Sequence, residues 1–152
     1  MIGIQNDIIA ESIAEVGISA MDYFTWGHIA MGLGFFALLS FLHVYFKYIK
    51  QSDAFPIWLA LLITVIIGIF WEFFENFVLW SWGLKFENRQ DSLLNASMDI
   101  IFVTLAAAFY LLLWKLLIKP GEMKSAYITY TVYLIGFILM IIFYFVGKMM
   151  TP

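Results

Sequence analysis

Apolar residues run almost without interruption through four stretches of the chain, at residues 24–46, 57–80, 93–114 and 127–146. A helix needs about 20 mostly apolar residues to cross the hydrocarbon core of a bilayer. Short polar joins separate the stretches, so consecutive helices are expected to be antiparallel neighbours. The pattern therefore predicts an all-α integral membrane protein, a four-transmembrane antiparallel helical bundle forming a single transmembrane domain over residues 1–152.

Residues 5–18 precede the first stretch and show a different pattern. Asp7, Glu11 and Glu15 recur every four residues, and isoleucines lie on the other faces. This spacing predicts a short N-terminal amphipathic interfacial helix with a solvated acidic face. Such a helix would lie along the membrane surface or cover the mouth of the bundle.

The composition narrows the classes of function. The chain is 64% hydrophobic and 12% charged, whereas a soluble domain carries about 25% charged residues. The net charge of −3 leaves no basic field for a nucleic acid. Cysteine is absent, which excludes thiolate catalysis and cysteine-ligated metal centres.

Basic residues near the ends of the stretches predict the orientation. Cytoplasmic loops carry an excess of Lys and Arg. Five lysines fall on one side of the expected bundle and three basic residues on the other: Lys47, Lys50, Lys115, Lys119 and Lys124 against Lys85, Arg89 and Lys148. We therefore expect a protein integral to the cytoplasmic membrane with both termini outside.

Ionisable and amide side chains interrupt three of the apolar stretches. They are His28 in the first, Glu72, Glu75 and Asn76 late in the second, and Asp91, Asn95 and Asp99 around the start of the third. Because the second stretch runs opposite to its neighbours, all of them are expected at one membrane depth, in the outer half. Spacings of three, four and eight residues place those of each helix on one face. The sequence thus predicts one intramembrane polar site.

The charge of this site needs compensation. An acid at the centre of a transmembrane helix costs about 2.5–3.5 kcal/mol on insertion scales. Four acids fall here, and Arg89 is expected to be their permanent positive partner. Three arrangements stay open: shared protons, a bound hard cation, or a water-filled cavity open to the outside. A purely structural layer of interhelical hydrogen bonds is the alternative.

Two sets of side chains are candidates for chemistry. His28 is expected to act as an acid or base, with Glu72 and Asp99 as proton exchangers. Glu72, Glu75, Asp91 and Asp99 are the candidate metal ligands. Carboxylate oxygens favour a divalent cation such as Mg²⁺, Ca²⁺ or Mn²⁺; with one histidine, Zn²⁺ or Fe²⁺ is less natural.

Three further residues are candidate ligand contacts. Asn76 and Asn95 would orient a ligand through their amides, and Arg89 would contact an anionic group at the mouth of the site. The first hypothesis is a small membrane protein, an enzyme or a binding protein, that acts on a membrane lipid or lipid-linked envelope molecule. The alternatives are a cation- or proton-translocating homo-oligomer and a non-catalytic subunit of a larger membrane complex.

Two motifs carry a family resemblance. Residues 71–76 read W-E-x-x-E-N, and residues 91–99 read D-S-x-x-N-x-S-x-D. Together with His28, they resemble an uncharacterised family of small bacterial integral membrane proteins and, more distantly, the VanZ-like family. The resemblance covers about residues 24–114. Likeness to VanZ-like proteins implies work on envelope lipids at the outer surface.

Overall fold

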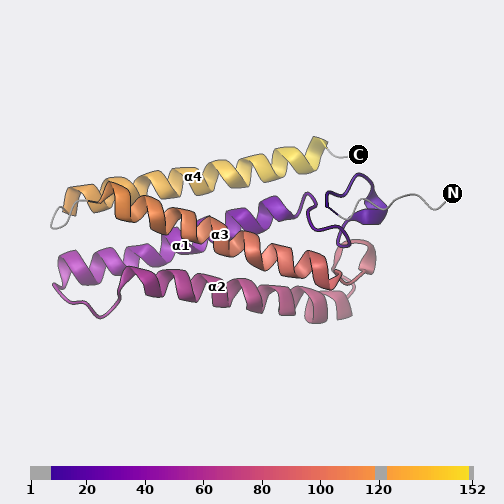
Figure 1. Ribbon diagram of the computed structural model, residues 1–152, viewed down its shortest axis with the longest axis horizontal. Coiled ribbons are helices and arrows are strands. Elements are labelled where there is room, and N and C mark those ends of the chain that lie inside the picture. Colours follow the sequence, from indigo (N-terminus) through magenta and orange to yellow (C-terminus); the bar gives the residue numbers. More distant parts are fainter. Residues whose placement is uncertain (1–7, 119–122, 151–152) are drawn as a thin grey trace.

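The structure, a computed structural model, describes residues 8–118 and 123–150 (Figure 1). Its long helices are α1 (Thr25–Val44), α2 (Ile57–Phe73), α3 (Leu93–Leu117) and α4 (Met123–Met150). Two π-helical turns continue them, η2 (Tyr45–Ile49) after α1 and η3 (Phe74–Leu79) after α2. The predicted antiparallel, all-helical architecture is confirmed.

Three helical segments of the described residues are long and apolar enough to cross a membrane: Thr25–Ile49, Ile57–Leu79 and Leu93–Leu117. They coincide with the first three predicted spans. The apolar stretch in α4, Met123–Leu139, is shorter. A fourth span and the orientation of the termini therefore stay predictions.

The central pair of the bundle is α1 and α3. Helix α2 packs against both on one side and α4 on the other (Figure 1). Helices α1 and α3 begin at the same end of the bundle at which η3 finishes. We call this the site end, because the polar residues predicted to meet lie there, and we call the opposite end the far end.

Close approach of α1, α2 and α3 depends on two glycines. A Cβ atom on Gly32 would collide with the backbone carbonyl of Val103 in α3. A Cβ atom on Gly68 in α2 would lie 2.9 Å from Cγ1 of the same valine. Small residues let helix backbones approach closely in lipid, where packing drives helix association. These contacts bring α1 and α2 to α3 within one to two turns of the polar residues.

Substitution of Gly32 by alanine is expected to destabilise the bundle by up to about 2 kcal/mol. Overpacking costs about 1–3 kcal/mol, and the gain in helix propensity offsets about 1 kcal/mol of it. Gly68→Ala is expected to cost less, because the side chain of Val103 can shift where its backbone cannot. Unfolding by SDS, followed by circular dichroism, measures both changes. Equal losses would contradict this account of the α1–α3 contact.

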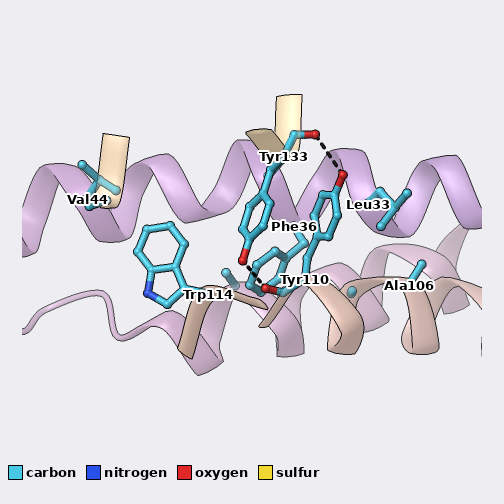
Figure 2. Packing of buried hydrophobic residues seen from close by; sticks show 11 residues of the cluster. Leu33, Phe36, Val44, Ala106, Tyr110, Trp114 and Tyr133 are labelled. Carbon is cyan, nitrogen blue, oxygen red and sulfur yellow. Dashed lines mark hydrogen bonds between the residues drawn. The ribbon is translucent and has the colours of Figure 1, made fainter. Parts of the chain in front are cut away.

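The apolar core fills the far half of the bundle (Figure 2). Tyr110 of α3 and Tyr133 of α4 stack with ring centroids 4.1 Å apart. Each hydroxyl donates to the other residue's backbone carbonyl, Tyr110 at 3.1 Å. Phe36 and Trp114 complete the cluster. A buried hydroxyl without a partner costs about 1–3 kcal/mol, so this reciprocal pair lets two tyrosines fasten α4 to α3.

The N-terminal arm differs from the prediction. Residues 8–18 do not form the expected amphipathic helix; they contain one short 3₁₀ helix, η1 (Ile13–Glu15), and Gly17 turns the chain at φ +74°. Carbonyl groups within residues 13–16 accept hydrogen bonds from Arg89, and that of Ile18 accepts from Ser92. Side chains outside the arm thus donate to backbone carbonyls that the predicted N-terminal helix would use for its own hydrogen bonds. The arm covers the site end, and residues 5–7 lie outside the described residues.

Candidate functional site

A buried histidine bridges two carboxylates from two other helices. His28 of α1 lies with Nδ1 3.3 Å from Glu72 Oε1 of α2, and with Nε2 3.6 Å from Asp99 Oδ2 of α3. The three side chains are 8%, 6% and 3% exposed. The hydroxyl of Thr25 donates to Asp99 Oδ1 at 3.4 Å. We call His28, Glu72 and Asp99 the His28 cluster; it joins the three helices near the site end.

A second group of polar residues surrounds a buried lysine. The ammonium of Lys85 donates to Asn76 Oδ1 at 2.8 Å, lies 3.5 Å from Glu75 Oε1 and forms an ion pair with Asp91. Its side chain is 4% exposed. Asn76 also accepts from the backbone of Asp91 at 2.7 Å and donates to Asp91 Oδ2 at 3.1 Å. These four residues, the Lys85 cluster, close the loop between η3 and α3.

The two clusters meet through the end of α2. Asn76 donates to the backbone carbonyl of Glu72 at 3.1 Å and to its Oε2 at 3.3 Å. The α-helix changes to the π-helical turn η3 at Phe74, between the two glutamates. Such turns are frequent at functional sites. A carboxylate oxygen of Glu72 and one of Glu75 each lie within 4.8 Å of a ring nitrogen of His28.

The N-terminal arm and the residues that join it to α1 cover the site end. Asn95 donates to the backbone carbonyl of Ser19 at 2.8 Å and to Asp22 Oδ2 at 3.4 Å. Asp22 is buried and accepts from the backbone of Gly17 and Phe24, each at 2.8 Å. Asp22, between the arm and α1, therefore adds a fifth acid to the four that were predicted here.

Six of the residues that the sequence predicted to share one polar layer lie close together. The structure brings together His28, Glu72, Glu75, Asn76, Asp91 and Asp99. Arg89 and Asn95 instead bind the arm. The expectation that Arg89 is the permanent positive partner of the acids is wrong, because Lys85 occupies that position. Asp91 pairs with Lys85 and does not belong to the His28 cluster.

Two members of the site were missed, Lys85 and Asp22. Lys85 lies five residues after the end of the predicted second span, and nothing in its local pattern distinguishes it from a solvated loop lysine. Asp22 did leave a signal. It precedes Thr25 by three residues, and the two form reciprocal contacts at the start of α1: Thr25 Oγ1 accepts from the Asp22 backbone at 3.1 Å. A polar residue followed three positions later by another one before an apolar run is typical of a helix start.

A cleft between α1 and α2 reaches both clusters. Its volume is about 260 Å³, and its lining includes His28, Glu75, Phe24 and Met31, with the partly exposed Trp71 at its edge. A second, apolar groove of about 320 Å³ lies between α1 and α4. Gly27 and Met31 line both cavities, so the polar cleft and the apolar groove adjoin along α1.

Comparison of the chain with protein-family models, with curated proteins and with solved structures finds no match. The resemblance to VanZ-like proteins and to the smaller bacterial family therefore stays a prediction from the motifs. What the chain does has to be argued from the site itself.

Proposed function

We propose that this protein binds a membrane amphiphile from the side of the bundle and holds its polar headgroup against His28 and Glu75. The observation that carries the proposal is the cleft between α1 and α2, in which these two side chains lie among apolar ones such as Phe24 and Met31. A few polar groups in a mostly apolar concavity are typical of small-molecule sites. Because the arm covers the site end, a ligand approaching between the helices comes from the bilayer.

The adjoining groove supports a hydrocarbon tail as part of that ligand. It is lined by apolar side chains of α1 and α4, among them Phe35, Leu38 and Phe137. Gly27 and Met31 connect it to the cleft. A molecule with its headgroup at His28 and its tail along α1 would fill both cavities. A lipid or lipid-linked molecule has this shape, whereas a water-soluble metabolite has no hydrocarbon tail to fill the groove.

The headgroup would meet groups suited to acid–base chemistry. An imidazole held between two carboxylates can give or take a proton, and Glu75 offers an acceptor beside it. His28 is the group for proton transfer in this proposal, while Glu72 and Asp99 hold its ring.

The alternatives receive less support from the contacts. The polar side chains deeper in the bundle, Ser40, Thr64 and Thr104, each donate to a carbonyl of their own helix at 2.7–2.8 Å. They therefore favour a closed site over a path for protons or cations. A partner subunit is not needed to supply a positive charge to the Lys85 cluster, because Lys85 of the same chain pairs with Glu75 and Asp91.

Filling the junction of the two cavities is expected to remove the bound amphiphile. Met31→Trp places an indole ring where the cleft meets the groove. Lipids extracted from the wild-type protein after detergent purification are expected to be enriched in one amphiphile relative to the membrane as a whole. The Met31→Trp variant is expected to lose at least about nine tenths of that enrichment, which a loss of 1.4 kcal/mol in binding produces. Mass spectrometry of the extracts measures the ratio.

The matched control is Ile66→Trp on α2. Ile66 is 54% exposed, and it belongs to neither cavity's lining. This variant is expected to retain the amphiphile at the wild-type level. A wild-type extract with the composition of the bulk membrane would contradict the proposal, and so would equal retention by Met31→Trp.

A further inference from the structure

We infer that His28, Glu72 and Glu75 bind one divalent transition-metal ion at the inner wall of the cleft. Each of the three side chains offers a ligand atom, and these atoms all lie within 4.8 Å of one another. The inference concerns the same cavity as the proposed function. An ion bound at Nδ1 of His28 replaces the proton-transfer role proposed for that residue, but it leaves amphiphile binding as a separate question, because metal binding is measured without one.

An unpaired oxygen points to the ion. Of the described residues, Glu72 Oε1 is the buried side-chain N or O atom that lacks a hydrogen-bond partner, although its side chain is only 6% exposed. It lies 3.3 Å from Nδ1 of His28. Two ligands of a tetrahedral ion at about 2.1 Å each are about 3.4 Å apart. The spacing of these two atoms therefore suits an ion bound between them.

Asp99 occupies the position of a supporting residue. Its Oδ2 lies 3.6 Å from Nε2, the ring nitrogen of His28 that faces away from Glu72. Histidines that bind metal through one nitrogen almost always donate from the other to a carboxylate or carbonyl. Thr25 in turn donates to Asp99 Oδ1 at 3.4 Å. This arrangement orients the ring so that Nδ1 faces Glu72.

The ligand set differs from the four carboxylates that the sequence predicted. Asp91 is paired with Lys85, and Asp99 lies behind the imidazole. One imidazole and two carboxylates remain, and one oxygen of Glu75 lies within 4.8 Å of the ligand atoms of His28 and Glu72. Nitrogen and oxygen ligands together favour Zn²⁺, Mn²⁺ or Fe²⁺ over Ca²⁺ or Mg²⁺. Two carboxylates also balance the ion's two positive charges, and the cleft leaves room for a further ligand.

Direct metal binding tests the inference. The purified full-length protein in detergent is stripped with a chelator, equilibrated with buffered Zn²⁺ and analysed for metal content. We expect one Zn²⁺ per chain. His28→Gln and Glu75→Gln are each expected to lower the affinity at least tenfold, and Asp99→Asn by about 10–100-fold, as loss of a supporting residue does.

His43→Gln is the matched control, because His43 is the chain's other histidine and binds the Phe55 carbonyl at 2.8 Å near the far end. Its Zn²⁺ affinity is expected to equal that of the wild type. Should a site variant fail to fold, the visible spectrum of Co²⁺ bound to the wild-type protein, and its displacement by Zn²⁺, tests the same ligands. Absence of stoichiometric Zn²⁺ and Co²⁺, or unchanged binding by His28→Gln, overturns the inference. A protein that binds Zn²⁺ but no amphiphile contradicts the proposed function alone.

Discussion

Replacing Lys85 with methionine is expected to lower the free energy of unfolding by about 3–5 kcal/mol, the cost of removing one partner from a buried ion pair. Its ammonium group contacts Asp91, Glu75 and Asn76, and its side chain is 4% exposed. Without it, two largely buried carboxylates face each other with no positive charge between them. Methionine has a similar length and keeps the apolar contacts of the lysine stem, so the loss reports on the charge.

Two comparisons make this prediction specific. Asp91→Asn in the Lys85→Met background removes one of the unpaired charges, and it is expected to recover part of the lost stability. Lys47 forms an exposed pair with Asp53 at the far end, with side chains 47% and 81% exposed, and its hydrogen bond holds the pKa of Asp53 below its ordinary value. Lys47→Met is expected to leave stability unchanged, because exposed pairs contribute little. SDS unfolding measures all four proteins, and equal effects at positions 47 and 85 would contradict the role of Lys85.

The helices could be predicted because they are long and apolar. A long apolar stretch that is able to span a membrane has to satisfy its backbone hydrogen bonds internally, as a helix does. The predicted starts at 57 and 93 agree with those of α2 and α3. The residue contacts between helices were harder to predict from the sequence. The backbone contact of Gly32 with Val103 does not follow from the sequence of α1, because the pairing of faces depends on all three helices at once.

The depth of the polar site was predictable from direction alone. Antiparallel helices bring the end of the second span beside the starts of the first and third, which is where His28, Glu72 and Asp99 meet. Which groups pair within that layer was not predictable. Arg89 lies nearer the third span than Lys85 in the sequence, yet the loop turns Lys85 inward and Arg89 toward the arm. The geometry of the loop, in which Glu87 and Asn88 adopt positive φ, decides which of the two basic side chains turns toward the acids.

The arm was mispredicted because its periodicity described a helix in isolation. Its acids recur every four residues, but Gly17 and the side chains of Arg89, Ser92 and Asn95 give its backbone other partners. Tertiary hydrogen bonds outweigh the weak preference of a short helix, which is marginal on its own in water. This bears on the proposed function, in which the arm covers the end of the bundle and the ligand enters by the cleft between α1 and α2.

Replacing the whole His28 cluster with apolar residues is expected to separate its structural role from its functional one. His28→Leu alone leaves Glu72 and Asp99 buried without the imidazole as a polar partner, and a loss of about 1–3 kcal/mol is expected. The triple variant His28→Leu, Glu72→Met and Asp99→Leu removes all three polar groups together. Replacing both partners of a buried hydrogen bond with apolar groups of similar shape can be nearly neutral or stabilising. SDS unfolding should therefore place the triple variant at or above the stability of the wild type.

The same triple variant is expected to lose the co-purified amphiphile, because the headgroup no longer meets His28 while the apolar groove along α1 is unchanged. This combination, a stable bundle that no longer retains its ligand, is the signature of a polar layer kept for function at no benefit to the fold. If the layer were only interhelical hydrogen bonding, the triple variant would unfold more easily than His28→Leu. If it were stable and still retained the amphiphile at the wild-type level, the headgroup would bind elsewhere. Unfolding and lipid extraction are measured on the wild type, the single variant and the triple variant. A purely structural layer predicts that the triple variant is less stable than His28→Leu. A binding site predicts that the triple variant is the more stable of the two and retains no amphiphile.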